Sequence, residues 1–374
     1  MDIKKNKICH LTSVHPPFDI RIFYKECASL AKAGFEVFLI APIQNRENRE
    51  GIEIIPVKLP ASRLKRMLVV TFRMYHLAVK TKFRIFHFHD PELMLCGILL
   101  KLSGKKVIFD VHENVRLSLI SKEWIPKALK GILGILYFTF ERIAILFYDK
   151  LILAEESYLK YYPIKKSIVV LNYPLHKNIE FKEREFLSPF KFVYSGVVHP
   201  LRGVWEMIQV IKQLNDVNFN VTLDLVGELR PIDLREKLDT FIKENQMEKM
   251  ITMHGKVDFS EISGYLNTAD IGFSLLKPIP NYKESLPTKI FEYMQHGLPV
   301  IANSFPLYKK YVEDVETGIC IDINNIEDAV IRITELLDDR ERLMEMAQNG
   351  KFITQNQYNW KSQEIKLLEV YSSM

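Results

Sequence analysis

Short apolar runs alternate with amphipathic segments along almost the whole sequence, and the same rhythm occurs in each half. An apolar run of about four to eight residues predicts a buried strand, whereas apolar residues three and four positions apart predict a helix. Regular alternation of the two is typical of a parallel, doubly wound sheet. The sequence therefore predicts an α/β fold with two such sheets, and its 374 residues suffice for two domains of ordinary size. The expected helices include 21–33, 91–103, 232–244, 287–295 and 326–346.

The charge of the chain changes sign where this rhythm restarts. Residues 1–180 hold 29 Lys and Arg against 17 Asp and Glu, whereas residues 181–374 hold 22 against 29. We therefore expect a domain boundary near residue 180, a linker over 172–187, and a basic partner surface on the first half.

Cysteine usage and hydropathy indicate a cytoplasmic protein. The four cysteines have no close pair, which excludes a disulfide scaffold and a zinc ribbon and fits a reducing cytosol. The first seven residues lack the apolar core of a signal peptide, and the longest clean apolar run, 131–140, is shorter than the roughly 20 residues that span a bilayer. No histidine and carboxylate stand at a metal-binding spacing, so we expect a site without a metal ion.

The strongest local signal is a pair of carboxylates, Glu284 and Glu292, on either side of Pro287. Proline in the first turn of a helix predicts Glu284 in the preceding loop and Glu292 within the helix. The backbone amides between them would form an anion site, which suits a sugar nucleotide held between two carboxylates. The spacing by itself, however, favours two solvated acids.

The wider stretch 286–302 resembles the donor-site signature of the family 4 retaining glycosyltransferases. The branch it resembles reads Pro-Thr-Lys-x-Phe-Glu-Tyr-Met, as residues 287–294 do, and the resemblance extends over about residues 8–360. It implies the GT-B fold, with two Rossmann-like domains that face each other across a cleft. The implied acceptor domain is 1–175 with a helix at 357–374 that crosses back to it, and the implied donor domain is 186–356.

The resemblance also implies the activity. Such an enzyme moves a hexosyl unit, with retention and without a metal, from a nucleotide sugar to a glycan or polyprenyl-linked acceptor in polysaccharide biosynthesis, such as that of capsule or O-antigen. A UDP- or GDP-linked donor is expected, and no further cofactor. Two alternatives remain: a sugar-nucleotide epimerase of the same fold, and a noncatalytic carbohydrate-binding scaffold.

The roles implied for the second half concern the donor. Glu292 would bind its ribose and Glu284 its sugar. In this family a Gly-Arg pair and a later Lys-Gly pair hold the diphosphate. Here Gly196 is followed by Val197, a departure, and Arg202 with Gly203 takes the place of the second pair. The remaining implied donor residues are Leu286, Pro287, Thr288 and Lys289 beside the phosphates, with Gly227 and Lys256 on later loops.

In the first half, His112 ends a predicted strand, and the resemblance implies that it faces the transferred sugar. The first loop lacks the glycine pair of most relatives, so His15, Asp19 and Arg21 are candidates for acceptor or phosphate binding. Asp19 would equally cap the next helix, with Arg21 solvated. His89, Asp90 and Glu113 also follow strands, although Asp90 is equally a helix cap and Glu113 a plain exposed acid.

A membrane surface is the partner expected for the basic first half. The segment 62–84 predicts a basic amphipathic helix, and 124–150 adds basic residues before an apolar body. Together they favour weak association with the anionic inner face of the cell membrane. The stretch 132–147 by itself is more typical of a packed core helix. No motif supports nucleic acid as a partner.

Overall fold

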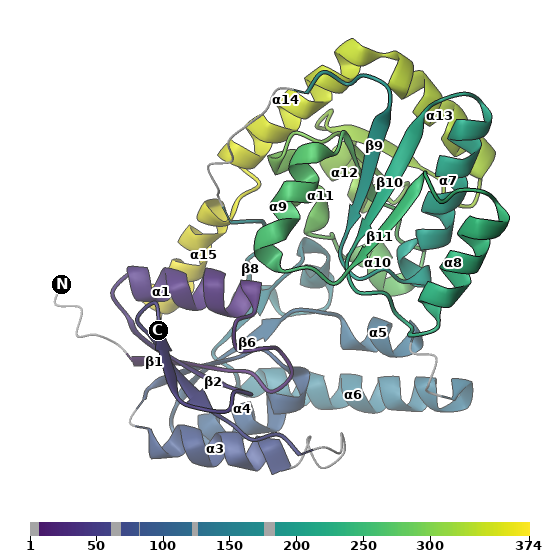
Figure 1. Ribbon diagram of the computed structural model, residues 1–374. Helices are drawn as coiled ribbons and strands as arrows, with labels where there is room; N and C mark the ends of the chain where they lie inside the picture. Colours follow the sequence, from purple (N-terminus) through teal and green to yellow (C-terminus); the bar gives the residue numbers. More distant parts are fainter. Residues whose placement is uncertain (1–6, 61–68, 82, 122–125, 176–183) are drawn as a thin grey trace. The chain divides into compact units, whose positions relative to one another are not determined.

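The computed structural model describes residues 7–60, 69–81, 83–121, 126–175 and 184–374. They belong to two compact units (Figure 1): unit 1 comprises Met1–Leu175 with Trp360–Met374, and unit 2 comprises His176–Asn359. Each unit is an α/β domain on a parallel sheet, which confirms the predicted fold class. The features expected at 62–68, at Trp124 and over the middle of the linker lie outside the described residues.

The sheet of unit 1 has eight strands within the described residues, in the order β3-β4-β2-β1-β5-β6-β7-β8. All neighbours run parallel except β3, which pairs antiparallel with β4 at one edge. The strands are β1 (Lys7–Leu11), β2 (Glu36–Ala41), β3 (Glu47–Arg49), β4 (Ile52–Pro56), β5 (Ile85–Phe88), β6 (Lys106–Val111), β7 (Lys150–Leu153) and β8 (Ser167–Val169).

Helices cover both faces of this sheet because successive strand residues point to opposite sides. Cys9 packs into a cluster with residues of α3, α4 and α6, whereas Ile8 packs with residues of η1, α1 and α15. The helical segments are the π-helix η1 (Ile20–Cys27), α1 (Ala28–Lys32), α3 (Thr71–Lys80), α4 (Met94–Leu102), α5 (Val115–Ser121), α6 (Lys127–Phe147) and α15 (Trp360–Ser372), with short 3₁₀ turns at Pro91–Leu93, Glu156–Lys160 and Ile164–Lys166.

Unit 2 has six parallel strands in the order β11-β10-β9-β12-β13-β14. Figure 1 shows α7 and α8 on one side of this sheet and α9 and α11 on the other. The strands are β9 (Phe190–Ser195), β10 (Val221–Val226), β11 (Ile251–Gly255), β12 (Ile271–Ser274), β13 (Val300–Asn303) and β14 (Gly318–Ile321). The helices are α7 (Val204–Asp216), α8 (Leu234–Glu244), α9 (Phe259–Thr268), α10 (Pro280–Glu284), α11 (Lys289–Gln295), α12 (Pro306–Val312), α13 (Ile326–Asp338) and α14 (Arg340–Asn356), with a 3₁₀ turn at Pro200–Arg202.

Several expected elements differ from those observed. The helix expected at 326–346 is two helices, α13 and α14, because the side chain of Asp339 accepts from the backbone N–H of Arg342 and starts a new helix there. The helix expected at 287–295 begins at Lys289, and Glu284 ends the short helix α10 instead of lying in a loop. The sequence analysis also did not predict β3, α5 or α12.

Candidate functional site

In unit 1, Asp90 ties the first loop to the end of β5. Its carboxylate accepts from the Thr12 hydroxyl at 2.9 Å and from the backbone N–H of Val14, and it pairs with His15 Nδ1 at 2.9 Å. Burial disfavours the charge of Asp90, but His15 and the loop donors outweigh it and lower its pKa to about 2. The same contact raises the pKa of His15 against the effect of burial. The side chain of Asp90 makes no cap bond to the turn that follows, so Asp90 holds the loop and does not cap a helix.

Asp19 and Arg21 have structural contacts. Asp19 accepts from the backbone N–H groups of Arg21 and Ile22 at 2.8 and 3.0 Å, and so caps η1. The alternative interpretation of Arg21 as a solvated residue is wrong, because Arg21 is only 4% exposed. Its Nε and Nη2 donate to Asp110 at 3.0 and 2.9 Å, and its Nη1 donates to the carbonyl of Val170. Arg21 is therefore committed to the interior of unit 1.

Asp110, at the end of β6, is the central acid of this edge of the sheet, and the sequence analysis did not assign it a role. It is fully buried and accepts from Arg21, from His89 Nδ1 at 3.1 Å and from His112 Nε2 at 2.6 Å. Burial disfavours its charge, but Arg21 and His112 hold the pKa of Asp110 well below its ordinary value. Burial lowers the pKa of His89 to about 4, so His89 is neutral at neutral pH.

A cavity of about 720 Å³ lies beside these residues. His112 reaches both the cavity and Asp110, and its side chain is 17% exposed. Glu113 also lines the cavity and is exposed, as its alternative interpretation expected. The other polar lining residues include His15, His89 and Asp90, and the apolar wall includes Val14, Met94, Leu95, Val115, Leu119, Tyr137 and Phe140.

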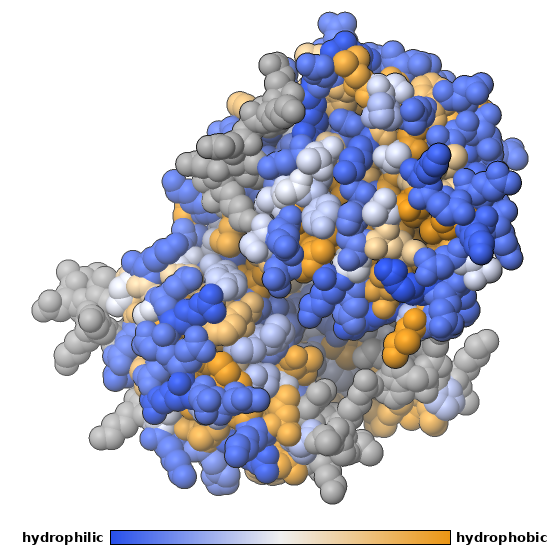
Figure 2. Space-filling view, viewed as in Figure 1, coloured by the Kyte–Doolittle hydropathy of each residue, from blue (hydrophilic) through white to orange (hydrophobic). Residues whose placement is uncertain are grey.

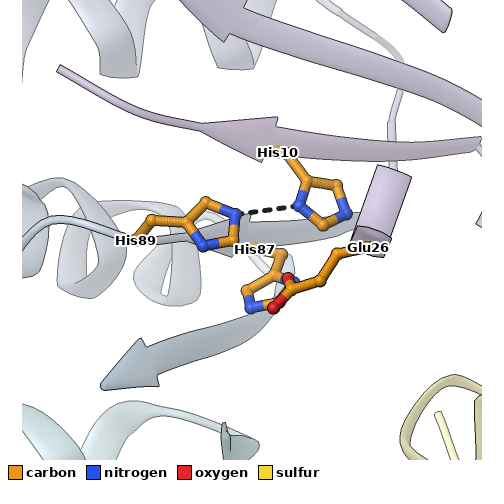
Figure 3. Close-up of side chains that lie close together, drawn as sticks. All are labelled: His10, Glu26, His87 and His89. Carbon is orange, nitrogen blue, oxygen red and sulfur yellow. Dashed lines mark hydrogen bonds and ion pairs between the residues drawn. The ribbon is translucent and has the colours of Figure 1, made fainter. Parts of the chain in front are cut away.

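Three further buried side chains, His10, Glu26 and His87, meet His89 behind this edge, as Figure 3 shows. His10, Glu26, His87 and His89 each place one potential ligand atom within 4.8 Å of the others, and His89 forms a second such group with Asp110 and His112. Spacing along the chain did not predict either group, because the parallel strands join residues as far apart as His10 and His89. That the site works without a metal ion stays a prediction.

In unit 2, two cations flank Gly196 at the end of β9. A Cβ on Gly196 would lie 3.2 Å from Lys289 Nζ and 3.6 Å from Arg202 Nη1. Lys289 is 7% exposed, and its Nζ lies 3.5 Å from the centre of the Tyr194 ring. Among the described residues this Nζ has no hydrogen-bond partner. Burial, and then the charge of Arg202, hold the pKa of Lys289 well below its ordinary value.

Two glycines let the backbone close up around this pair of cations. Gly227, at the end of β10, has φ of 149°, and a Cβ there would lie 1.9 Å from the carbonyl oxygen of Gly196. Gly203 has φ of 78° at the start of α7, and its Cβ would lie 1.8 Å from the carbonyl oxygen of Leu275. No residue with a Cβ fits at either position without a backbone shift.

Most of the other predicted donor residues lie in α11 or in the segment just before it. Glu292 lies one turn after Lys289, is partly buried, and its charge acts on Lys289. Glu284 is also partly buried, as are Leu286, Pro287 and Thr288 between α10 and α11. Lys256 follows β11 and is exposed, with its charge near Glu228. The structure therefore brings Gly196, Arg202, Lys289 and Glu292 together and places Lys256 at the surface.

Two family models match the chain. "Glycosyltransferase Family 4" matches residues 21–162, and "Glycosyl transferases group 1" matches residues 176–352. An uncharacterized glycosyltransferase of Haemophilus influenzae is 23% identical over 90% of this chain and 91% of its own length. One from Methanocaldococcus jannaschii is 24% identical over 56% of this chain, and the match spans only 55% of that relative.

Solved structures share the fold. Sucrose-phosphate synthase from Thermosynechococcus elongatus superposes with a TM-score of 0.77 at 16% identity, over 98% of each chain. HepE from Anabaena, solved with UDP-glucose, superposes with a TM-score of 0.74 at 14% identity, over 98% of this chain and 100% of its own. Residues 21–162 thus match a Glycosyltransferase Family 4 domain and residues 176–352 a Glycosyl transferases group 1 domain, and the fold is that of the GT-B glycosyltransferases.

Proposed function

We propose that this protein is a metal-independent, retaining glycosyltransferase. It moves a hexosyl unit from a UDP- or GDP-sugar to a glycan or polyprenyl-linked acceptor in polysaccharide biosynthesis. The acceptor hydroxyl attacks the anomeric carbon on the face that the leaving group departs from. As the bond from that carbon to the phosphate oxygen breaks, the leaving diphosphate takes the proton of the hydroxyl.

The observation that carries this proposal is the pair of cations at Gly196. A buried ammonium group that lies beside a guanidinium and has no hydrogen-bond partner among the described residues is costly unless an anion joins it, because like charges repel and burial removes their hydration. A nucleoside diphosphate supplies that anion. Lys289 provides the second positive charge that Val197 does not, and Lys289 and Arg202 together offset the negative charge on the leaving phosphate. Glu292 then binds the ribose and Glu284 the sugar.

In unit 1, we assign His112 to a hydroxyl of the transferred sugar. His15, Asp90 and Glu113 shape the acceptor side of the 720 Å³ cavity. Its mixed lining suits an acceptor with both polar and apolar parts. UDP is the first nucleotide to test, because HepE of the same fold was solved with UDP-glucose.

Helix α6 supports an acceptor at a membrane surface. The interpretation of this stretch as a packed core helix is wrong, because a stripe of apolar side chains along it is exposed. Figure 2 shows apolar atoms where Figure 1 draws α6. The one acid of α6, Glu141, is buried against Tyr137 and Tyr162. None of the described helices is long and apolar enough to cross a bilayer, so we propose peripheral binding at the inner face. The stripe comprises Leu129, Ile132, Leu133, Leu136, Phe140 and Ile143.

Calorimetric titration of the whole protein with UDP, GDP, ADP and CMP, in the presence of EDTA, tests the donor site. We expect one nucleotide to bind and Lys289→Met to weaken it about 10- to 100-fold, which is the usual loss for a charge-assisted hydrogen bond. Because the pKa of the empty lysine is depressed, binding should take up a proton at pH 8, which buffers of different ionisation enthalpy reveal. Lys289→Met should abolish this uptake.

Lys283→Met is the matched control, since Lys283 is exposed on α10 in the same segment. Glu292→Ala should weaken both the nucleotide and its nucleoside, whereas Lys289→Met should weaken only the nucleotide. If none of the four nucleotides binds, or if Lys289→Met binds as tightly as the wild type, the proposed donor site is wrong. Incubation with donor alone separates transfer from the epimerase alternative, which needs no acceptor.

A further inference from the structure

A line of buried polar side chains runs along one face of the unit 1 sheet. His10, His87 and Asp110 follow Ile8, Ile85 and Ile108 by two positions, so they share the face that packs against η1 and α15. Their neighbours in space are Arg21, Glu26, His89, His112 and Tyr371.

Asp110 lies at one end of this line, and its carboxylate can only accept hydrogen bonds. Arg21 donates to both of its oxygens, which keeps the carboxylate charged. His89 Nδ1 and His112 Nε2 lie 3.1 and 2.6 Å from Oδ2, so each must carry its proton there. These two nitrogens are 3.2 Å apart, but they do not bond to each other, since both donate to the same oxygen.

The tautomers of the remaining histidines then follow one from another. Neutral His89 with its proton on Nδ1 has a free lone pair on Nε2, which accepts from His10 Nδ1 at 2.9 Å. His10 Nε2 then accepts from the Tyr371 hydroxyl at 3.3 Å. The Tyr371 oxygen in turn accepts from His87 Nδ1 at 2.7 Å. Every bond in this chain points toward Asp110.

We infer that Asp110 is the positioning residue of His112. Asp110 holds the His112 proton on Nε2, so that Nδ1 of His112 offers a lone pair to a substrate hydroxyl. The chain of hydrogen bonds through His87, Tyr371, His10 and His89 fixes the proton of His89 on Nδ1, from which it is donated to Asp110. The role of His112 in transfer rests on the proposed function, but the tautomers rest on unit 1 alone.

A metal ion held by His10, Glu26, His87 and His89 is the competing arrangement for the same side chains. It needs lone pairs from both His10 and His89 directed at the ion. The facing nitrogens of these two rings instead lie at hydrogen-bond distance and share one proton. A metal ion would therefore break the chain of hydrogen bonds, and NMR of the histidine ring nitrogens distinguishes the two arrangements.

Nitrogen NMR of the full chain labelled with ¹⁵N-histidine, at pH 8, tests the chain directly. We expect the proton on Nδ1 of His10, His87 and His89, which is the minor tautomer of imidazole in water, and on Nε2 of His112. Single His→Gln variants assign the signals. Tyr371→Phe should change the signals of His87 and His10, which bond to its hydroxyl, whereas Asp110→Asn should change those of His112, His89 and His10. An Nε2–H tautomer at His10 or His89, or one equivalent of bound metal by elemental analysis, overturns the chain.

Kinetics test the consequence for His112. We expect Asp110→Asn to lower kcat about 10- to 100-fold, since an amide no longer fixes the tautomer, and to leave the affinity for the nucleotide unchanged. Asp149→Asn is the control, because Asp149 accepts from the N–H of Val107 near the other end of β6 and pairs with Lys101.

The kinetic outcomes separate the inference from the function on which it rests. A folded Asp110→Asn variant with the kcat of the wild type overturns the positioning role. If no nucleotide binds the wild type, the proposed function fails, while the NMR signals still decide the chain. If Asp110→Asn does not fold, Tyr371→Phe and the wild-type spectrum decide it.

Discussion

At the scale of single residues, the cation pair of unit 2 depends on two strand ends, at Gly196 and Gly227, that approach each other closely because neither residue has a side chain. The carbonyl oxygen of Gly196 lies 1.9 Å from where a Cβ on Gly227 would stand, and Lys289 and Arg202 lie beside the position of a Cβ on Gly196. The position of the cation pair therefore depends on a residue that contacts neither cation.

Gly227→Ala should destabilise unit 2 by about 3 kcal/mol or more, because the backbone must both move and keep a strained φ. It should also weaken nucleotide binding. Gly264→Ala is the control: Gly264 lies within α9 with nothing near its Cβ position, and alanine there should stabilise by about 0.5–1 kcal/mol. Urea unfolding of both variants measures the difference. Equal stability of the two would contradict the close approach.

The sequence predicted several candidate site residues but not the buried residues that bond to them. His112, Asp90 and Glu292 could be selected because each lies in or beside a local motif. Asp110 and the burial of Arg21 could not, since the two are 89 positions apart and only the order of the strands brings them together. Lys289 was chosen from a motif, but its position beside Arg202 depends on the packing of α11 against the end of β9.

At the scale of elements, α6 exposes an apolar face. Its apolar residues recur three and four positions apart on the exposed side, while the acid of the helix is turned inward. Apolar periodicity predicted the helix but not its exposed face, because the pattern does not say which side a sheet covers. Periodicity likewise continues through Asp339, which is why one helix was expected where α13 and α14 lie.

Leu136→Glu should reduce co-sedimentation with phosphatidylglycerol vesicles several-fold and leave the free energy of unfolding within about 0.5 kcal/mol, since Leu136 is 61% exposed. The matched control is Ile331→Glu on α13, because Ile331 is 58% exposed on a helix of unit 2. Equal vesicle binding by the two variants would remove α6 from the membrane proposal.

At the scale of the whole molecule, the buried groups of unit 1 make stability depend on pH. Burial lowers the pKa values of His10, His87 and His89 in the folded state, so below about pH 6.5 the unfolded chain binds these protons more strongly. Glu26 acts in the opposite direction, because burial and then Asp110 raise its pKa and the folded state keeps a proton that the unfolded state releases above about pH 4.5. Burial also raises the pKa of Glu141, which acts in the same direction as Glu26, but the three histidines outweigh the two glutamates.

We therefore expect the free energy of unfolding to fall from pH 6.5 to pH 4.5, by about 1–2 kcal/mol per pH unit at the steepest. Above pH 6.5 it should fall slowly again, because Glu26 and His15 then hold protons only in the folded state. Denaturation followed by tryptophan fluorescence in a Trp205→Phe background reports unit 1, where Trp360 is buried. Stability that is constant from pH 4.5 to 6.5 would show that these histidines are not held neutral.

The helix α15 has a consequence for how the protein is made. Trp360 donates to the Ser29 hydroxyl at 2.9 Å and Tyr371 bonds to His87, so the sheet of unit 1 is completed by a segment that is translated after all of unit 2. Unit 2 is continuous in the chain and has all its residues earlier. Unit 1 must therefore wait, with the part of its sheet face that α15 covers still exposed, until α15 emerges, and a nascent chain that stops short of residue 360 leaves that part open to chaperones and proteases.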